Sequence, residues 1–133
     1  MINRTIWMYW HQGFNQAPPI IEPCVNQWKK LNPGWDLKLL DQNSIYDYAS
    51  PLPIKKKTLD RMILPHQSDL LRTQLLINHG GVWADPTTFP LKPLDDWLLN
   101  KMDAGYFFFH RPGRDRIIAN WFIAAEKNNN MLN

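Results

Sequence analysis

The sequence predicts an α/β fold, a Rossmann-like and mainly parallel sheet flanked by helices. Short hydrophobic runs suited to buried strands begin at Thr5, Trp35, Val82 and Gly105. Segments with helical character separate these runs, and strands that alternate with helices favour parallel pairs. At 133 residues the chain is long enough for one core, and it contains no internal repeat or linker, so residues 1–133 are predicted to form a single domain.

The first half of the chain alternates strand and helix. The run that opens at Thr5 predicts a buried strand ending at Gln12 and Gly13. A loop over 13–19 leads to a predicted helix from Pro18 to Leu31, since proline is tolerated in a first helical turn. The alternating run 35–40 predicts a second, parallel strand, and a short helix is predicted over 44–49.

The second half continues the pattern and contains one long helix. We expect a helix over 55–63, broken at Pro65, and a further helix from Asp69 to Asn78. Gly80 and Gly81 end this helix, because glycine adopts left-handed backbone conformations without a Cβ penalty. The remaining expectations are a strand at 82–84, a short helix at 94–98, a strand at 105–110 and a helix-like segment at 117–125.

An acid and a base share one face of the long helix. Asp69 and Arg72 are three residues apart, so on a helix they lie on the same side. Leu71, Leu75 and Leu76 supply its buried side. The helix therefore presents charge on one side and apolar surface to the core on the other.

A second acid is predicted at the end of the following strand. Proline cannot donate a ladder hydrogen bond, so Pro86 stops the strand and leaves Asp85 at its carboxyl tip. Ligands of open α/β sheets bind outside the carboxyl ends of the strands. Asp85 is therefore a candidate binding residue. These residues also have non-functional interpretations. Asp85 could be a solvated acid in a turn, and Asp69 could form a surface ion pair with Arg72.

These motifs together resemble a known family. The residues are Ser-Asp-Leu-Leu-Arg at 68–72, Gly-Gly at 80–81, Asp-Pro-Thr at 85–87 and the opening strand over 5–13. They resemble the sugar-binding region of glycosyltransferase family 32, and more closely its bacterial relatives, the capsular polysaccharide synthesis proteins. The resemblance runs from about Thr5 to Trp97. It implies an A-type glycosyltransferase fold, which at this length would be incomplete at its C-terminus.

The resemblance implies a catalytic set of Asp69, Arg72 and Asp85. Asp85 is expected to hold a divalent cation, Mn²⁺ or Mg²⁺, with Thr87 or water completing the ligand shell. Thr87 stands where the family's acidic motif has a second carboxylate, and a hydroxyl binds such a cation more weakly. No residue is identified as a nucleophile or general base.

The same resemblance implies a set of donor-binding residues. They are Trp10, Gln12, Asp69, Arg72 and Gly81. Most tryptophans of the chain are expected to fill the core, since aromatics dominate cores too. Trp10 and Gln12 are the better candidates because they lie nearest the strand end.

The implied activity is the transfer of a sugar from a nucleotide-diphosphate donor, with retention of stereochemistry. The acceptor would be a saccharide or a lipid-linked saccharide in capsular or cell-surface polysaccharide synthesis. The alternative is a non-catalytic or truncated module that binds sugar nucleotides, which the short chain and Thr87 favour.

Charge and cysteine content exclude few classes of protein, but they indicate the cellular compartment. The net charge is +3, and the basic run at 55–57 with Arg61 is interpreted as a solvated helix face, so no nucleic acid partner is expected. Cys24 is the only cysteine, which excludes an intramolecular disulfide and favours a buried thiol in a reducing compartment. No apolar run reaches the roughly 20 residues of a spanning helix. We expect a cytoplasmic protein, with peripheral association at the inner membrane face as an option.

Two other enzyme classes find little support. His79-Gly80-Gly81 resembles an esterase oxyanion loop, but no Gly-x-Ser-x-Gly nucleophile motif exists in the chain. The four histidines show no zinc-ligand spacing.

Overall fold

A computed structural model describes residues 2–49, 64–113 and 116–127, with side chains at 2–49, 70–107 and 122–127. Its strands are β1 (Thr5–Tyr9), β2 (Asp36–Leu40), β3 (Gly81–Ala84), β4 (Tyr106–Gly113) and β5 (Arg116–Ala125). Its α-helices are α1 (Ile21–Leu31), α2 (Tyr46–Ala49) and α4 (Leu64–His79). Three short 3₁₀ helices are η1 (Phe14–Gln16), η2 (Leu94–Asp96) and η3 (Leu99–Lys101).

The described strands form one mixed sheet in the order β2-β1-β3-β5-β4. β1 pairs in parallel with β2 and with β3, whereas β5 is antiparallel to both β3 and β4. The α/β class and the parallel pairs are therefore confirmed, and the antiparallel strands make the sheet mixed. All five residues of β1 are buried, because β1 lies inside the sheet and both of its faces pack against core residues.

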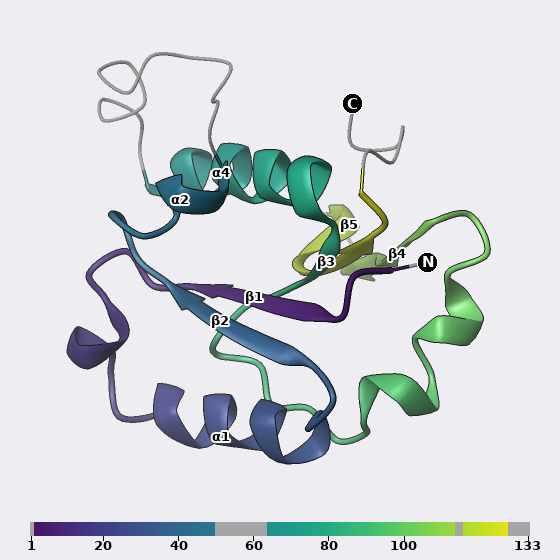
Figure 1. The fold of residues 1–133 in the computed structure, drawn as a ribbon, viewed down its shortest axis with the longest axis horizontal. Coiled ribbons are helices and arrows are strands. Elements are labelled where there is room, and N and C mark those ends of the chain that lie inside the picture. The colour runs from purple at the N-terminus through teal and green to yellow at the C-terminus, as the bar shows by residue number, and fades with distance from the viewer. Residues whose placement is uncertain (1, 50–63, 114–115, 128–133) are drawn as a thin grey trace.

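Helices cover both faces of this sheet. Helix α1 lies against one face, and α2 and α4 lie against the other (Figure 1). The alternation of side chains along β1 sends Ile6 and Met8 into the core under α1, and Trp7 and Tyr9 into the core under α4. Both cores thus depend on the same central strand.

The turn between α4 and β3 requires two glycines. Gly80 and Gly81 have φ angles of 71° and 114°. A Cβ on Gly81 would lie 2.6 Å from the carbonyl oxygen of Thr5, and one on Gly80 would lie 2.7 Å from the backbone nitrogen of Lys127. The turn therefore lies so close to neighbouring backbone that no side chain fits.

One predicted element has the wrong type. The segment 117–125, expected to be helix-like, lies within strand β5, where Ala125 and Phe122 pair with Gly81 and Ala84. A continuous apolar run does not distinguish a buried helix from a buried strand by periodicity alone. The isoleucines and aromatic residues of this run favour a strand.

The expected break at Pro65 is also wrong. Pro65 lies inside α4, which the structure describes from Leu64. The other differences concern boundaries. β1 ends at Tyr9 and not at Gln12 and Gly13, and α1 begins at Ile21. α2 is shorter than predicted, and the helix predicted at 94–98 is a 3₁₀ helix over Leu94–Asp96. The predicted helix over 55–63 lies outside the described residues.

Candidate functional site

The candidate site lies where the three parallel strands end. The register pairs Tyr9 with Leu40 and Trp7 with Trp83, so β1, β2 and β3 end at one edge of the sheet. In Figure 1 the arrowheads of β1 and β2 point to this side, away from the labelled N-terminus. We call residues 10–13, 41 and 85–88 the carboxyl edge. Ligands of open α/β folds bind at such an edge.

Asp85 begins a tight turn at the carboxyl edge. Its Oδ1 accepts hydrogen bonds from the backbone nitrogen of Thr87 at 2.9 Å and from the Thr87 hydroxyl at 2.6 Å. Its backbone oxygen accepts from the nitrogen and the hydroxyl of Thr88 at 3.0 and 2.6 Å. The first two bonds hold the carboxylate and the other two hold the turn, so Asp85 lies at the tip of β3 as predicted.

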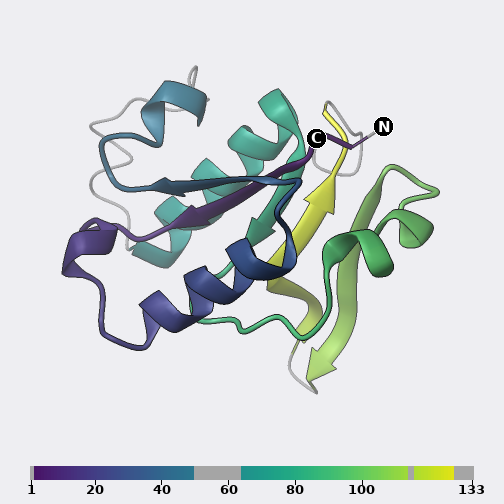
Figure 2. The ribbon, with the colours of Figure 1, turned by 60° about the horizontal axis from the view of Figure 1, so that its bottom comes forward.

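The lengths of α4 and β3 predict the position of Arg72 relative to Asp85. Gly80 joins α4 to β3, and the two elements run in opposite directions (Figure 2). A helix rises about 1.5 Å per residue and a strand about 3.3 Å. Arg72 therefore lies about 12 Å back along the helix from the turn, and Asp85 lies about 13 Å along the strand. The two distances from the turn are therefore similar for Arg72 and Asp85.

The packing of α4 fixes which side of the helix faces the sheet. Leu71, Leu75 and Leu76 are essentially fully buried in the core under α4, as predicted. Arg72 is half-buried. Asp69 lies one turn further toward the start of α4, and its side chain is outside the described side chains. The shared role of these residues with Asp85 stays a prediction.

Two other residues predicted to bind the donor lie in the loop after β1. Trp10 is half-buried against the core under α1, and its backbone nitrogen donates to the Leu40 oxygen at 3.0 Å. Gln12 is exposed. Both residues belong to the carboxyl edge, as expected. The aromatics Trp7 and Tyr9 are core residues, in line with the structural role expected of most aromatics in the chain.

Gly81 is not brought together with these residues. It lies at the opposite end of β3, where it pairs with Ala125 of β5 and is buried. Its structural role is the close backbone approach to Thr5 described above. The family's glycine pair therefore has a folding function in this chain.

Two residues of the carboxyl edge were missed by the sequence reasoning. Asp41 follows β2 directly, and its Oδ1 accepts from the backbone nitrogens of Asn43 and Ser44, both at 2.9 Å. These hydrogen bonds hold the pKa of the Asp41 carboxyl below its ordinary value. A Cβ on Gly13 would lie 3.8 Å from Asp41 Oδ2, so Asp41 adjoins the loop after β1. Its position directly after a predicted strand was the signal that would have found it.

His11 is the second missed residue. Its Nδ1 lies 2.8 Å from the Tyr9 hydroxyl, in a hydrogen bond whose donor depends on the histidine tautomer. Burial, together with the nearby Tyr46 and Asp41, raises the pKa of Tyr9 to about 12. Tyr9 is therefore neutral at physiological pH and connects the core to the carboxyl edge.

The residues at the tip of β3 suit a hard divalent cation only in part. Asp85 Oδ1 and Thr87 Oγ1 are 2.6 Å apart, so both oxygens can face one ion. No cluster of three or more histidine, cysteine or acidic residues with metal-binding geometry occurs among the described residues. Mg²⁺ is commonly held by one or two carboxylates together with substrate phosphates. The arrangement fits a cation that arrives with the phosphates of a donor.

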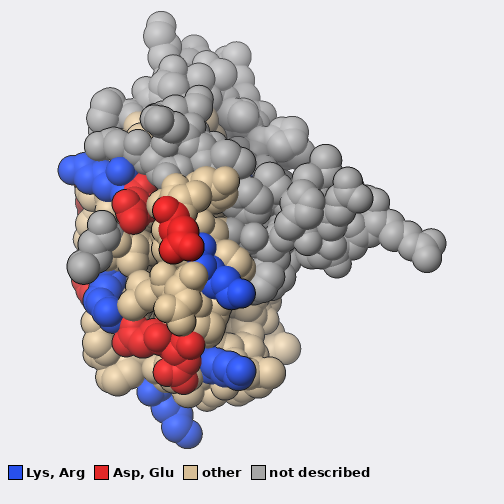
Figure 3. All heavy atoms as spheres, turned by 90° about the vertical axis from the view of Figure 1, so that its right-hand side faces the viewer, with Lys and Arg blue, Asp and Glu red and all other residues tan. Residues whose placement is uncertain are grey.

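Other polar residues with predicted roles have structural partners. Cys24 is buried, as predicted, and His79 Nε2 lies 2.8 Å from the Tyr48 oxygen. Asp95 lies in η2, where it pairs with Arg4 at 2.6 Å. Acidic and basic side chains are intermixed on the described part of the face in Figure 3, which gives a nucleic acid no uniformly basic surface. Within the described ranges, no helix is long and apolar enough to cross a membrane.

Comparisons with known proteins point to sugar transfer. The family model described as "Capsular polysaccharide synthesis protein" matches residues 1–133. The chain is 29% identical over 146 residues to the "O-glycosyltransferase braB" of Annulohypoxylon truncatum, covering 96% of this chain and 34% of that protein. It is 28% identical over 106 residues to the "Initiation-specific alpha-1,6-mannosyltransferase" of Saccharomyces cerevisiae, covering 72% of this chain and 22% of that protein.

A solved structure with the same fold is the "PaToxG Glycosyltransferase". It superimposes with a TM-score of 0.70 at 17% identity, covering 98% of this chain and 57% of that one. The α/β fold is thus that of a glycosyltransferase. The chain spans about a third of the length of the O-glycosyltransferase that it matches. Both sequence relatives are fungal, whereas the resemblance of the motifs pointed to bacterial proteins.

Proposed function

The chain belongs to the capsular polysaccharide synthesis protein family, and we propose that it transfers a sugar from a nucleotide-diphosphate donor to an acceptor hydroxyl. The observation that carries this proposal is the position of Asp85 at the carboxyl tip of β3, where its Oδ1 accepts hydrogen bonds from Thr87. A saccharide or lipid-linked saccharide is the proposed acceptor, in capsular or cell-surface polysaccharide synthesis. The fold and relatives support sugar transfer in general.

The proposed reaction exchanges one bond at the sugar for another. The acceptor oxygen forms a bond to the anomeric carbon while the bond from that carbon to the diphosphate oxygen breaks. The acceptor proton passes to the departing diphosphate, and the stereochemistry at the anomeric carbon is retained. No oxidant or external base is required.

Each residue of the carboxyl edge has a proposed task in this reaction. Asp85, with Thr87 or water, would hold a Mn²⁺ or Mg²⁺ ion, which would supply positive charge to the diphosphate. Arg72 binds the donor phosphates or pairs with a carboxylate through its planar guanidinium. Asp69 accepts hydrogen bonds from donor hydroxyls, and Trp10 and Gln12 contact the donor from the loop after β1.

A thermal-shift panel tests donor binding directly. Nucleotide sugars are tested with and without Mn²⁺, because a ligand that binds only the folded state raises its melting temperature. We expect at least one donor to stabilise the protein when Mn²⁺ is present. Stabilisation by no nucleotide sugar would contradict the proposal. A non-catalytic binding module, which Thr87 in place of a second acid favours, would show the shift without turnover.

A further inference from the structure

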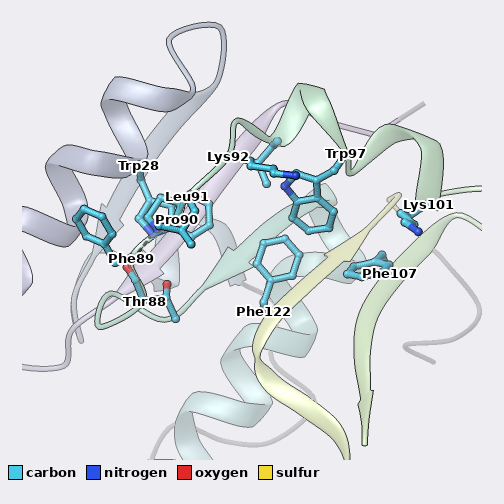
Figure 4. Close-up of a pocket in the computed structure, with 11 residues that line it drawn as sticks. Trp28, Thr88, Phe89, Pro90, Leu91, Lys92, Trp97, Lys101, Phe107 and Phe122 are labelled. Atoms are coloured by element: carbon cyan, nitrogen blue, oxygen red, sulfur yellow. Dashed lines mark hydrogen bonds between the residues drawn. The ribbon is translucent and has the colours of Figure 1, made fainter. Parts of the chain in front are cut away.

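A large apolar pocket lies on the face of the sheet that carries α1. It has a volume of about 590 Å³, within the range typical of small-molecule sites. Its described lining is mostly aromatic and aliphatic, with two lysines and one threonine as polar members (Figure 4). Its large apolar lining side chains include Trp28, Phe89, Leu91, Trp97 and Phe122.

Side chains of α1 hold one wall of the pocket in place through hydrogen bonds. The strap formed by residues 88–92 follows the Asp85 turn, and Trp28 Nε1 donates to the Thr88 oxygen at 3.1 Å. Gln27 Nε2 donates to the Pro90 oxygen at 3.2 Å. The strap is therefore held in place without a ligand, and the pocket is largely preformed. Preformed sites lose less free energy to ordering when they bind.

The opposite wall is an aromatic cluster. The rings of Trp97 and Phe122 have centroids 5.5 Å apart, and Phe107 contacts both of them at 5.4 and 6.2 Å. On the strap, Phe89 is 53% exposed and Leu91 is 84% exposed. Exposed apolar groups beside a concave aromatic surface mark a binding site for an apolar ligand.

The pocket adjoins the proposed catalytic edge. Phe122 pairs in register with Ala84, the residue before Asp85. Thr88, at the other side of the pocket, donates to the Asp85 backbone oxygen at 3.0 Å. Neighbouring strands are about 4.8 Å apart. A ligand that fills the pocket and extends past Thr88 therefore reaches the carboxyl edge.

We infer that this pocket binds the apolar portion of the acceptor, whose sugar hydroxyl then projects toward Asp85. The inference rests on the proposed function and adds the acceptor class, a saccharide joined to an apolar group. The exposed Lys92 and Lys101 on the lining favour a neutral or anionic apolar group over a cationic one. The bonds formed and broken are those of the proposed transfer.

Binding is tested without donor or metal, using the fluorescent probe 1-anilinonaphthalene-8-sulfonate. We expect the double variant Phe89→Ser, Leu91→Ser to bind the probe about tenfold more weakly than the parent, because apolar contact area is lost. The matched control is Ile20→Ser, which removes an apolar side chain that is 66% exposed and does not line the pocket. Circular dichroism verifies that each variant is folded.

A matched ligand pair tests the acceptor class. 2-Naphthyl β-D-glucopyranoside is expected to displace the probe, whereas methyl β-D-glucopyranoside, with the same sugar, is not. Equal weakening in the control variant, or equal displacement by both glucosides, would overturn the inference. So would a dimer in sedimentation that the double variant abolishes, because a second copy would then occupy the pocket.

The outcomes separate this inference from the proposed function. With donor and Mn²⁺, transfer to the naphthyl glucoside in preference to the methyl glucoside supports both. Release of nucleoside diphosphate with equal use of the two glucosides leaves the function standing and overturns the acceptor pocket. Selective probe displacement without any release of nucleoside diphosphate retains the pocket and contradicts the function.

Discussion

At the tip of β3, Asp85 uses one carboxylate oxygen to hold its own turn. That oxygen accepts two hydrogen bonds from Thr87, one of them from the hydroxyl that occupies the place of the family's second acid. A carboxylate with one hydroxyl neighbour is a weak cation site by itself. Under the proposed function, the phosphates of the donor would complete the ligand shell of the cation.

We expect the cation and the nucleotide to bind cooperatively. In isothermal titration calorimetry, we expect Mn²⁺ to bind weakly to the protein alone and at least about tenfold more tightly when a nucleoside diphosphate is present, because its phosphates add ligands. By reciprocity, Mn²⁺ should strengthen nucleotide binding by the same factor. Equal Mn²⁺ affinity in both cases would contradict this coupling.

Tyr9 gives a prediction at alkaline pH. Its pKa is raised to about 12 from an ordinary value of 10.0, so between these values the folded state holds a proton that the unfolded state has lost. The free energy of unfolding therefore falls as pH rises from about 10 to about 12. Urea unfolding across this range should show a smaller fall in Tyr9→Phe. An identical fall in both proteins would contradict the assignment.

At the scale of elements, the α4–β3 connection depends on two glycines with positive φ angles. The φ angle of 114° at Gly81 and its closeness to the Thr5 oxygen leave no room for a side chain. We expect Gly81→Ala to lower the free energy of unfolding by about 2 kcal/mol or more.

Gly34→Ala is the matched control for this substitution. A Cβ on Gly34 meets no atom within 4 Å, so the change should stay within about 1 kcal/mol of the parent. Urea unfolding measures both variants. A loss for Gly81→Ala no larger than that for Gly34→Ala would contradict the steric argument.

Sequence patterns predicted these elements to different degrees. The strands at β1, β2 and β3 and the end of α4 carry local signals, namely buried apolar runs and the Gly80-Gly81 pair. β5 was mistaken for a helix because its identity depends on pairing with β3, which is distant in sequence. For the same reason the pocket was not predicted, since α1, the strap and β5 form it jointly.

Site residues that come together only through contacts between distant segments were likewise not predicted from the sequence. Asp85 and Arg72 were predicted from local spacing and the family motif, and the structure has Asp85 directly after β3. Their shared role stays a prediction. Asp41 lies at the same edge through strand order alone. Gly81 was predicted from the family motif to bind the donor. In the fold it is a glycine because a Cβ would lie too close to the Thr5 carbonyl oxygen.

At the scale of the whole molecule, two cores share one sheet. Leu75 is fully buried in the core under α4, and we expect Leu75→Ala to lower the free energy of unfolding by about 2–5 kcal/mol through loss of packing. Leu99→Ala, at a leucine that is 38% exposed, should cost less than about 1 kcal/mol. Similar losses in the two variants would contradict the described packing.

The most direct test of the account is the release of nucleoside diphosphate from a nucleotide sugar in the presence of Mn²⁺. We expect slow release by the parent protein and a decrease of about 100-fold in Asp85→Asn, which keeps the shape of the side chain and removes its charge. Asp96→Asn, at an exposed acid in η2, is the matched control and should retain the parent rate. Equal rates for Asp85→Asn and the parent would contradict the central role of the carboxyl edge in sugar transfer.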